Sequence, residues 1–110
     1  MNIAITAFQR SVYKATSKIP RGKVSTYFEI AQAIGRPKAA RAIGNALHTN
    51  PFAPKVPCHR VVRSDGSLGG FFLGQEKKLK ILKKEGVICR LGKIIDFDSK
   101  FIKLTRIKSS

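Results

Sequence analysis

The pattern that most restricts the fold is a pair of short helical segments separated by Gly35 and Pro37. Thr26 opens a capping-box pattern, with a glutamate three residues later, which predicts a helix over residues 27–34. Gly35 is suited to end that helix, and Pro37 to begin a second helix over residues 38–47. Two short helices joined by a tight turn predict a helix-turn-helix, although plain helical hairpins give a similar pattern.

Apolar residues at helical spacing predict two further helices, over residues 6–19 and 75–85. In the latter helix the leucines are expected to face inward and the lysines outward. A turn at residues 63–67 is expected to join two short strands, and another strand is expected over residues 94–97. These elements predict an α+β fold that is mainly α, a winged-helix-like or helix-turn-helix DNA-binding domain with a few short strands.

The net charge of +16 indicates an anionic partner for this chain of 110 residues, the usual length of one domain. Nucleic acid, RNA-rich assemblies and a membrane surface are the candidates, while a solvated lysine-rich surface is the plainer explanation. No run of residues approaches the ~18 apolar residues of a membrane span. The two cysteines are too few for a disulfide scaffold, so we expect a reducing, cytoplasmic location. Since no span is present, we expect no membrane partner.

Cys58 is the first candidate for chemistry, because His59 and Arg60 follow it directly on a turn fixed by prolines. A thiolate is a good nucleophile, and neighbouring cations or a helix N-terminus stabilise it. A carboxylate such as Glu85 or Glu76 would orient the histidine. From these residues alone, a nucleophile and a buried structural cysteine remain alternatives.

A zinc site is a weaker interpretation of the same region. Cys58, His59, Cys89 and His48 could supply four ligands, but none of the usual paired spacings is present, so no metal is expected. Cys89 is expected to be a packing residue or a second thiol. Asn50 precedes a proline and is expected to organise a turn through bonds from its side chain to the backbone.

Small residues dominate the predicted helix over residues 38–47, among them Ala39, Ala40 and Gly44. Such a surface allows a DNA backbone to approach closely, and the guanidinium of Arg41 would then enter a groove or replace an extruded base. A phosphate contact or a solvated arginine is the alternative. Tyr27 is expected either to meet DNA or to pack in the core.

Four runs of the sequence resemble the C-terminal active domain of the methylated-DNA–protein-cysteine methyltransferases, the O6-alkylguanine-DNA alkyltransferases. With their spacing, the resemblance covers roughly residues 6–88. The runs are RAIGNAL (41–47), NP (50–51), PCHRVV (57–62) and GGF (69–71). The resemblance implies a suicide reaction, in which the cysteine permanently takes a methyl or alkyl group from O6 of a guanine that has been flipped out of double-stranded DNA.

In this reaction the resemblance implies that His59 deprotonates Cys58 through a water, that Glu85 polarises His59, and that Asn50 holds the active-site turn. No cofactor and no metal are implied. Arg41 would fill the base stack. The DNA contacts that follow are Tyr27, which would rotate the flipped nucleotide, Lys38, Ala39, Ala40 and Arg41. The substrate pocket that follows is Val61, Val62, Gly69, Phe71 and Phe72.

We expect residues 1–110 to form one monomeric alkyltransferase and DNA-binding domain, without the N-terminal ribonuclease-H-like domain of most relatives. Phe71 keeps an aromatic wall but has no hydroxyl group, and Phe72 is expected to narrow the pocket, which leaves the preferred size of alkyl group open. One alternative is an alkyltransferase-like protein, which binds alkylated guanine without chemistry and usually replaces the cysteine, often by tryptophan. Another is a helix-turn-helix regulator in which Cys58 is structural.

Overall fold

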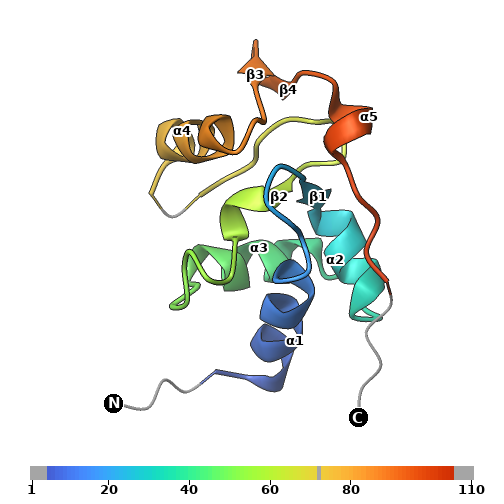
Figure 1. Ribbon diagram of the computed structural model, residues 1–110. Helices are drawn as coiled ribbons and strands as arrows, with labels where there is room; N and C mark the ends of the chain where they lie inside the picture. The colour runs from blue at the N-terminus through green and yellow to red at the C-terminus, as the bar shows by residue number, and fades with distance from the viewer. Residues whose placement is uncertain (1–4, 72, 106–110) are drawn as a thin grey trace.

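The computed structural model describes residues 5–71 and 73–105, and within these ranges the chain is mainly helical with a few very short strands (Figure 1). Phe72, expected in the substrate pocket, lies outside the described residues. Along the chain the elements are α1 (Ala7–Thr16), β1 (Ser25–Thr26), α2 (Tyr27–Ala33), α3 (Ala40–His48), the 3₁₀ helix η1 (Cys58–Arg60), β2 (Val61–Val62), α4 (Gln75–Lys84), β3 (Cys89–Arg90), β4 (Lys93–Ile94) and α5 (Phe97–Lys100). The predicted fold class is confirmed.

The helix-turn-helix consists of α2 and α3. The Thr26 hydroxyl accepts a hydrogen bond from the backbone N–H of Glu29 at 3.0 Å, as the capping pattern predicts. The Glu29 carboxylate, however, accepts from the backbone of Leu104 instead of closing the capping box. The second helix begins at Ala40, two residues later than predicted, and its N-cap residue, Ala39, makes no side-chain capping bond. Lys38 therefore lies in the turn that precedes α3.

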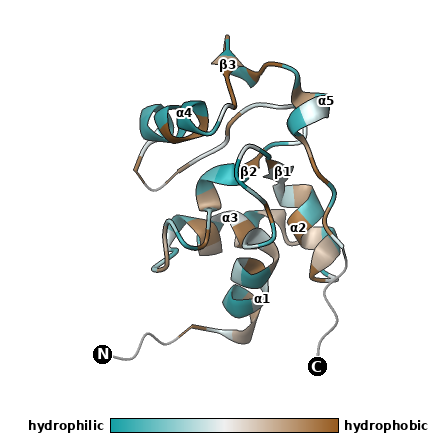
Figure 2. Ribbon diagram, viewed as in Figure 1, coloured by the Kyte–Doolittle hydropathy of each residue, from teal (hydrophilic) through white to brown (hydrophobic). Residues whose placement is uncertain are grey.

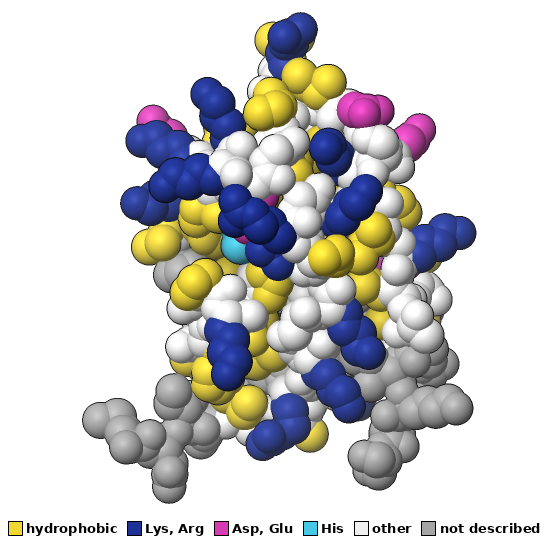
Figure 3. All heavy atoms as spheres, in the orientation of Figure 1, with side chains coloured by type: hydrophobic (Ala, Val, Ile, Leu, Met, Phe, Trp, Pro, Cys, Tyr) yellow, Lys and Arg dark blue, Asp and Glu magenta, His cyan; other side chains and the backbone are white. Residues whose placement is uncertain are grey.

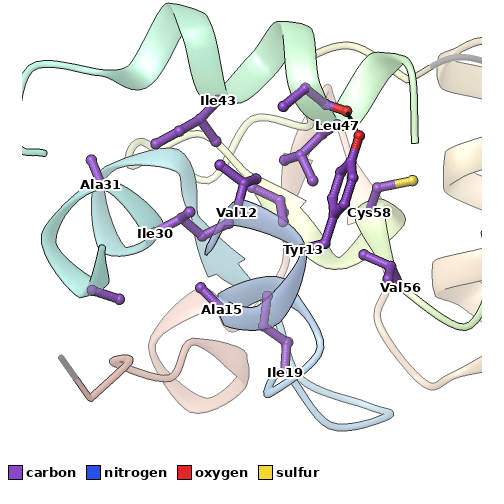
Figure 4. Close-up of a cluster of buried hydrophobic side chains, with 13 residues drawn as sticks. Val12, Tyr13, Ala15, Ile19, Ile30, Ala31, Ile43, Leu47, Val56 and Cys58 are labelled. Carbon is purple, nitrogen blue, oxygen red and sulfur yellow. Dashed lines mark hydrogen bonds between the residues drawn. The ribbon is translucent and has the colours of Figure 1, made fainter. Parts of the chain in front are cut away.

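One hydrophobic core joins α1, α2 and α3, and in Figure 4 Val12, Ile30 and Ile43 point toward one another within it. The hydroxyl of Tyr13 donates to the carbonyl of Ala46 at 2.8 Å and so links α1 to α3. Helix α1 ends at Thr16, earlier than the predicted residue 19, because the backbone N–H groups of Lys18 and Ile19 bond to residues three positions earlier and so form tight turns. Ile19 is nevertheless buried in this core.

The strands β1 and β2 pair in parallel, with Ser25 opposite Val61 and Thr26 opposite Val62. This pairing places the chain that follows Cys58 beside the start of α2. The predicted turn at residues 63–67 forms, but the expected hairpin does not, because its first strand pairs with β1 instead. Beyond the turn, Ser67 makes an isolated bridge to Lys93.

Helix α4 is predominantly hydrophilic (Figure 2), but one of its lysines faces inward. Lys78 and Leu82 are fully buried, whereas Leu79 is 37% exposed. The expectation that every lysine faces outward and that both leucines face inward is therefore wrong for Lys78 and Leu79. Residues 78 and 82 are four apart and share one face of the helix, so the lysine occupies the position of a core residue.

The C-terminal part forms a second core with β2 and α4, made by Val24, Val62, Leu68, Leu82, Val87 and Ile94. A hairpin, β3–β4, projects from this part of the molecule, above α4 in Figure 1. The strand expected over residues 94–97 is only partly correct. Ile94 ends β4, but Phe97 begins the short helix α5, because Asp96 at a φ of 58° turns the chain away from the sheet.

Candidate active site

A cavity of about 600 Å³ separates the helix-turn-helix from the segment at residues 63–71, and Cys58 lies on its wall. Figure 4 shows the sulfur atom of Cys58 pointing away from the core cluster to which its backbone belongs. The cavity is lined by Tyr27, Phe28, Ala40, Arg41, Gly44, Asn45, Leu47, His48, Cys58, Arg63, Ser64, Gly69, Gly70 and Phe71. The buried thiol therefore faces a cavity that it shares with residues of α2 and α3, the two helices of the helix-turn-helix.

Asn50 fixes the loop that leads to Cys58. Its side-chain amide donates to the carbonyl of Val56 at 2.8 Å, and its side-chain oxygen accepts from the backbone N–H of Phe52 at 2.9 Å. The backbone N–H of Cys58 in turn donates to Val56. Asn50 is 6% exposed, so water does not compete strongly for these bonds. This turn sets where the cysteine enters the cavity.

Burial raises the pKa of the Cys58 thiol. A hydrogen bond with the Asn50 side chain, the charge of Lys78, and the backbone N–H groups of Cys58 and His59 act in the opposite direction without outweighing burial. The thiol is therefore protonated at neutral pH, and a base is needed to generate the thiolate. Arg60, expected from the sequence to help stabilise the thiolate, instead bonds to a carboxylate.

That carboxylate is Glu85, which also bonds to the histidine. Nε2 of His59 lies 3.1 Å from Oε2 of Glu85, while Arg60 donates to both carboxylate oxygens, at 3.0 and 2.8 Å. The bidentate pair leaves the carboxylate ionised, so Nε2 of His59 carries the proton that it shares with Glu85. The other ring nitrogen, Nδ1, is then left as the basic atom of the ring.

Burial lowers the pKa of His59, and the hydrogen bond and charge of Glu85 oppose this only in part. The imidazole is thus neutral near pH 7 and able to accept a proton. Burial would raise the pKa of Glu85, but hydrogen bonds from Arg60 and His59 outweigh it and hold that pKa below its ordinary value. Of the two carboxylates considered in the sequence, the structure places Glu85 at the histidine.

Lys78 is a residue of this site that sequence reasoning missed. Its ammonium group donates to the carbonyl oxygens of Val61, Leu68 and Gly70 at 2.7, 2.6 and 3.1 Å. Burial lowers its pKa to about 8, and the thiol of Cys58 is among the groups that interact with its charge. Lys78 therefore ties β2 to the cavity wall at residues 68–70. Its position four residues before Leu82, on the apolar face of α4, was the feature of the sequence that could have revealed its burial.

Gly69 and Tyr27 meet inside the cavity. Gly69 has a φ of 72°, and a Cβ atom at this position would lie 2.8 Å from the Tyr27 hydroxyl oxygen. Only glycine fits there without moving the tyrosine. Burial raises the pKa of Tyr27, with the charge of Arg63 opposing it, so the phenol keeps its proton and can donate a hydrogen bond.

The expected site residues are distributed unevenly. Tyr27, Ala40, Arg41, Gly69 and Phe71 line the cavity, whereas Lys38 and Ala39 lie in the preceding turn and do not. Val61 and Val62, expected in the substrate pocket, are fully buried in the two cores and do not reach the cavity. Residues that line it without having been expected there include Asn45, His48, Arg63 and Ser64.

Neither a metal centre nor a membrane span is present within residues 5–71 and 73–105. Nowhere in these ranges do three His, Cys, Asp or Glu side chains gather closely enough to hold a metal ion. The helices in the same ranges are too short or too polar to cross a bilayer.

Comparisons with known proteins single out one family. The family described as "6-O-methylguanine DNA methyltransferase, DNA binding domain" matches residues 7–87. A methylated-DNA–protein-cysteine methyltransferase of Methanosarcina acetivorans is 51% identical over 81 residues, which are 74% of this chain and 52% of the relative. The bifunctional transcriptional activator and DNA repair enzyme Ada of Escherichia coli is 45% identical over 77% of this chain and 24% of its own length. The chain thus spans about half or less of these curated relatives.

Two solved structures resemble this one along different lengths. The Mycobacterium tuberculosis protein OGT in complex with DNA has a TM-score of 0.74 and 45% identity, over 77% of this chain and 52% of that chain. The S. pombe protein Atl1, in complex with damaged DNA containing O6-carboxymethylguanine, has a TM-score of 0.79 and 34% identity. The match to Atl1 covers 92% of this chain and 99% of that chain.

Proposed function

The chain belongs to the 6-O-methylguanine DNA methyltransferase family, and from this premise we propose that it repairs DNA by taking alkyl groups from O6 of guanine onto Cys58. One observation carries the proposal. A buried thiol faces a cavity beside a helix-turn-helix, and the residue that follows it is a neutral histidine bonded to an ionised carboxylate. A structural cysteine needs neither the cavity nor the base.

The transfer needs one proton to leave the thiol and one to reach the purine. We propose that Nδ1 of His59 accepts the proton of Cys58 through a water, while Glu85 stabilises the resulting imidazolium. The thiolate attacks the alkyl carbon, the S–C bond forms, and the C–O6 bond breaks with its electron pair moving to the purine. The purine takes up a proton and becomes guanine. Cys58 is left as a thioether, so each molecule reacts once.

DNA binding is expected at the helix-turn-helix. Arg41 lines the cavity and would fill the gap left by the extruded guanine, while Tyr27 would help to rotate that nucleotide into the cavity. The small side chains of Ala39 and Ala40 allow close approach of the duplex, and Lys38 would contact phosphate. Flipping costs a few kcal/mol, and it costs least for poorly paired bases, which favours damaged guanines.

The remaining parts of this proposal come from the sequence. The domain is expected to act as a monomer in the cytoplasm, on double-stranded DNA that contains alkylated guanine, without a cofactor. The two free cysteines are consistent with a reducing compartment.

Non-catalytic recognition of damage is the second candidate, because the match to Atl1 extends over nearly the whole of both chains. The presence of Cys58 next to a usable base favours transfer over recognition alone. In the alternative, the cavity would hold an alkylated guanine without breaking its C–O6 bond.

The experiment that distinguishes alkyl transfer from recognition alone measures the alkylated guanine that remains in the DNA. A duplex with a single O6-methylguanine is incubated with increasing amounts of protein, and the remaining lesion is quantified after digestion to nucleosides. We expect guanine to appear in a plateau amount equal to the amount of protein, and no loss of lesion with Cys58→Ala. Tight binding without loss of the lesion by the unaltered chain would support the recognition protein.

A further inference from the structure

The loop of the β3–β4 hairpin contains a residue, Leu91, whose side chain does not suit the backbone conformation of the loop. The loop consists of Leu91 and Gly92, and both have positive φ, 53° and 80°. Two-residue loops with this backbone strongly prefer asparagine, aspartate or glycine at both positions, because other side chains crowd the backbone there. A leucine at the first position therefore weakens the hairpin instead of stabilising it.

Leu91 also contributes nothing to a core, because 98% of its surface is exposed. A single exposed apolar residue is common on protein surfaces, but this one also strains the backbone, and strained positions cluster at binding sites. The other large apolar residues with appreciable exposure, such as Phe28 and Leu73, are 52% and 53% exposed and so keep about half of their surface in contact with the protein. Leu91 differs from them in being presented entirely to the outside.

The charges beside the loop indicate which partner would accept it. Arg90 and Lys93 face each other across the hairpin next to Leu91, and both are exposed. Figure 3 shows lysine and arginine side chains spread over the visible face of the molecule, including the end from which the hairpin projects. An apolar tip flanked by two cations fits a polyanion with an apolar interior, as DNA has in its grooves between the phosphate rows.

The hairpin is connected to the rim of the cavity. The backbone N–H of Ile94 donates to the carbonyl of Gly66 at 2.9 Å, and Lys93 forms a β-bridge with Ser67. These contacts hold the hairpin against the turn at residues 63–67, and Arg63 and Ser64 of that turn line the cavity. DNA that delivers a guanine to the cavity would pass this turn, so the hairpin extends the same interface.

We propose that the β3–β4 hairpin is a second DNA contact, in which Leu91 enters a groove to one side of the flipped nucleotide and Arg90 and Lys93 contact the flanking phosphates. This inference deepens the proposed function and rests on it. The contact uses no base-specific hydrogen bonds, so it adds affinity for duplex DNA of any sequence.

The test compares Leu91→Asn with the unaltered chain. Asparagine suits the loop conformation, so the variant should unfold at an equal or higher temperature, which separates a lost contact from a damaged fold. We expect its Kd for a duplex with one O6-methylguanine to rise about ten-fold, as loss of an apolar contact predicts. Leu79→Gln, on the partly exposed face of α4, is the matched control and should leave the Kd unchanged.

Two further measurements assign the contact to DNA. Arg90→Gln and Lys93→Gln should each reduce the slope of log K against log salt concentration by about 0.9. The rate of alkyl transfer from free O6-benzylguanine, which needs no duplex, should be the same in all these variants. It also reports on the chemistry of Cys58 independently of the hairpin.

The outcomes are distinguishable. Equal Kd values for Leu91→Asn and the unaltered chain, with both binding duplex DNA, would overturn the hairpin contact and leave the proposed function standing. A change in self-association on sedimentation, with an unchanged Kd for DNA, would make Leu91 a contact between protein molecules and would equally overturn it. Failure of the unaltered chain to bind duplex DNA would overturn both proposals.

Discussion

Nε2 of His59 lies 3.1 Å from Oε2 of Glu85, although the two residues are 26 positions apart in the chain. The contact joins η1 to the C-terminal end of α4 and fixes the orientation of a ring that is 4% exposed. Arg60 donates to both oxygens of the same carboxylate, so the orientation of the Glu85 carboxylate is fixed by Arg60 as well as by His59. The histidine is thereby kept neutral by burial and basic by its partner.

The first prediction concerns the acid limb of the pH profile. Because the pKa of His59 is lowered, transfer to Cys58 from free O6-benzylguanine should be lost on acidification with a midpoint below 6.5, where the imidazole becomes protonated. Glu85 raises that pKa, so Glu85→Gln should move the midpoint to still lower pH while slowing the plateau rate by about ten- to a hundred-fold. Stopped-flow rates of the transfer step between pH 5 and 8 would measure both quantities.

Glu76→Gln is the matched control for that measurement, since it alters an exposed glutamate of the same helix. Its profile should follow that of the unaltered chain. An acid midpoint that stays fixed in Glu85→Gln would show that Glu85 only supports the fold.

The second prediction concerns Lys78, whose charge lowers the pKa of Cys58. At pH 7, where Lys78 still carries its charge, alkylation of the thiol by iodoacetamide should be slower in Lys78→Met, because the thiolate loses a neighbouring cation. Three buried carbonyl groups also lose their donor, so the free energy of unfolding should fall by roughly 1–3 kcal/mol in urea titrations. Lys77→Met, at the exposed neighbouring position, should change neither quantity. An unchanged alkylation rate at pH 7 in Lys78→Met would contradict the electrostatic role.

The third prediction concerns the wall of the cavity. Gly69→Ala places a methyl group 2.8 Å from the Tyr27 hydroxyl oxygen, at a φ of 72° that costs alanine about 1 kcal/mol. The tyrosine must move, so repair of O6-methylguanine in duplex DNA should slow by at least about ten-fold. Gly74→Ala, at a φ of 91° with open space around its Cβ and outside the cavity lining, serves as the control. Equal repair rates for the two variants would mean that the Tyr27 position does not matter.

The fourth prediction separates DNA handling from chemistry. Arg41 lines the cavity and has no expected part in proton transfer. Arg41→Ala should therefore slow repair of duplex DNA much more than it slows the reaction with free O6-benzylguanine, because only the duplex requires an extruded base to be replaced. Measured side by side, equal slowing with both substrates would argue against that role.

The helix-turn-helix and the cysteine motif were predictable because their signals are local. Thr26 marks the start of α2 through a bond that spans three residues, and the order of Cys58 and His59 is visible in the sequence itself. The residues alone left Glu85 and Glu76 as candidate partners of His59, and only the resemblance chose Glu85, because a contact across 26 residues leaves no periodic signal.

Two features that the sequence did not reveal depend on tertiary contacts. Lys78 was expected to face solvent, yet three carbonyl groups from β2 and from the segment at residues 68–70 create a binding site for its ammonium group inside the fold. Val61 and Val62 belong to the run of residues around the cysteine that resembles the family, but the parallel pairing with β1 directs them into the cores. Propensity cannot reveal either outcome, because the partners lie far away in the chain.

The central claim is that the sulfur of Cys58, and no other atom, receives the alkyl group. Mass spectrometry of the intact protein after reaction with an O6-methylguanine duplex, followed by peptide mapping, tests it most directly. We predict a gain of one methyl group on the peptide that contains Cys58, the same gain in Cys89→Ala, and none in Cys58→Ala. A methyl group on Cys89, or an unchanged mass in a chain that binds the duplex tightly, would contradict the account.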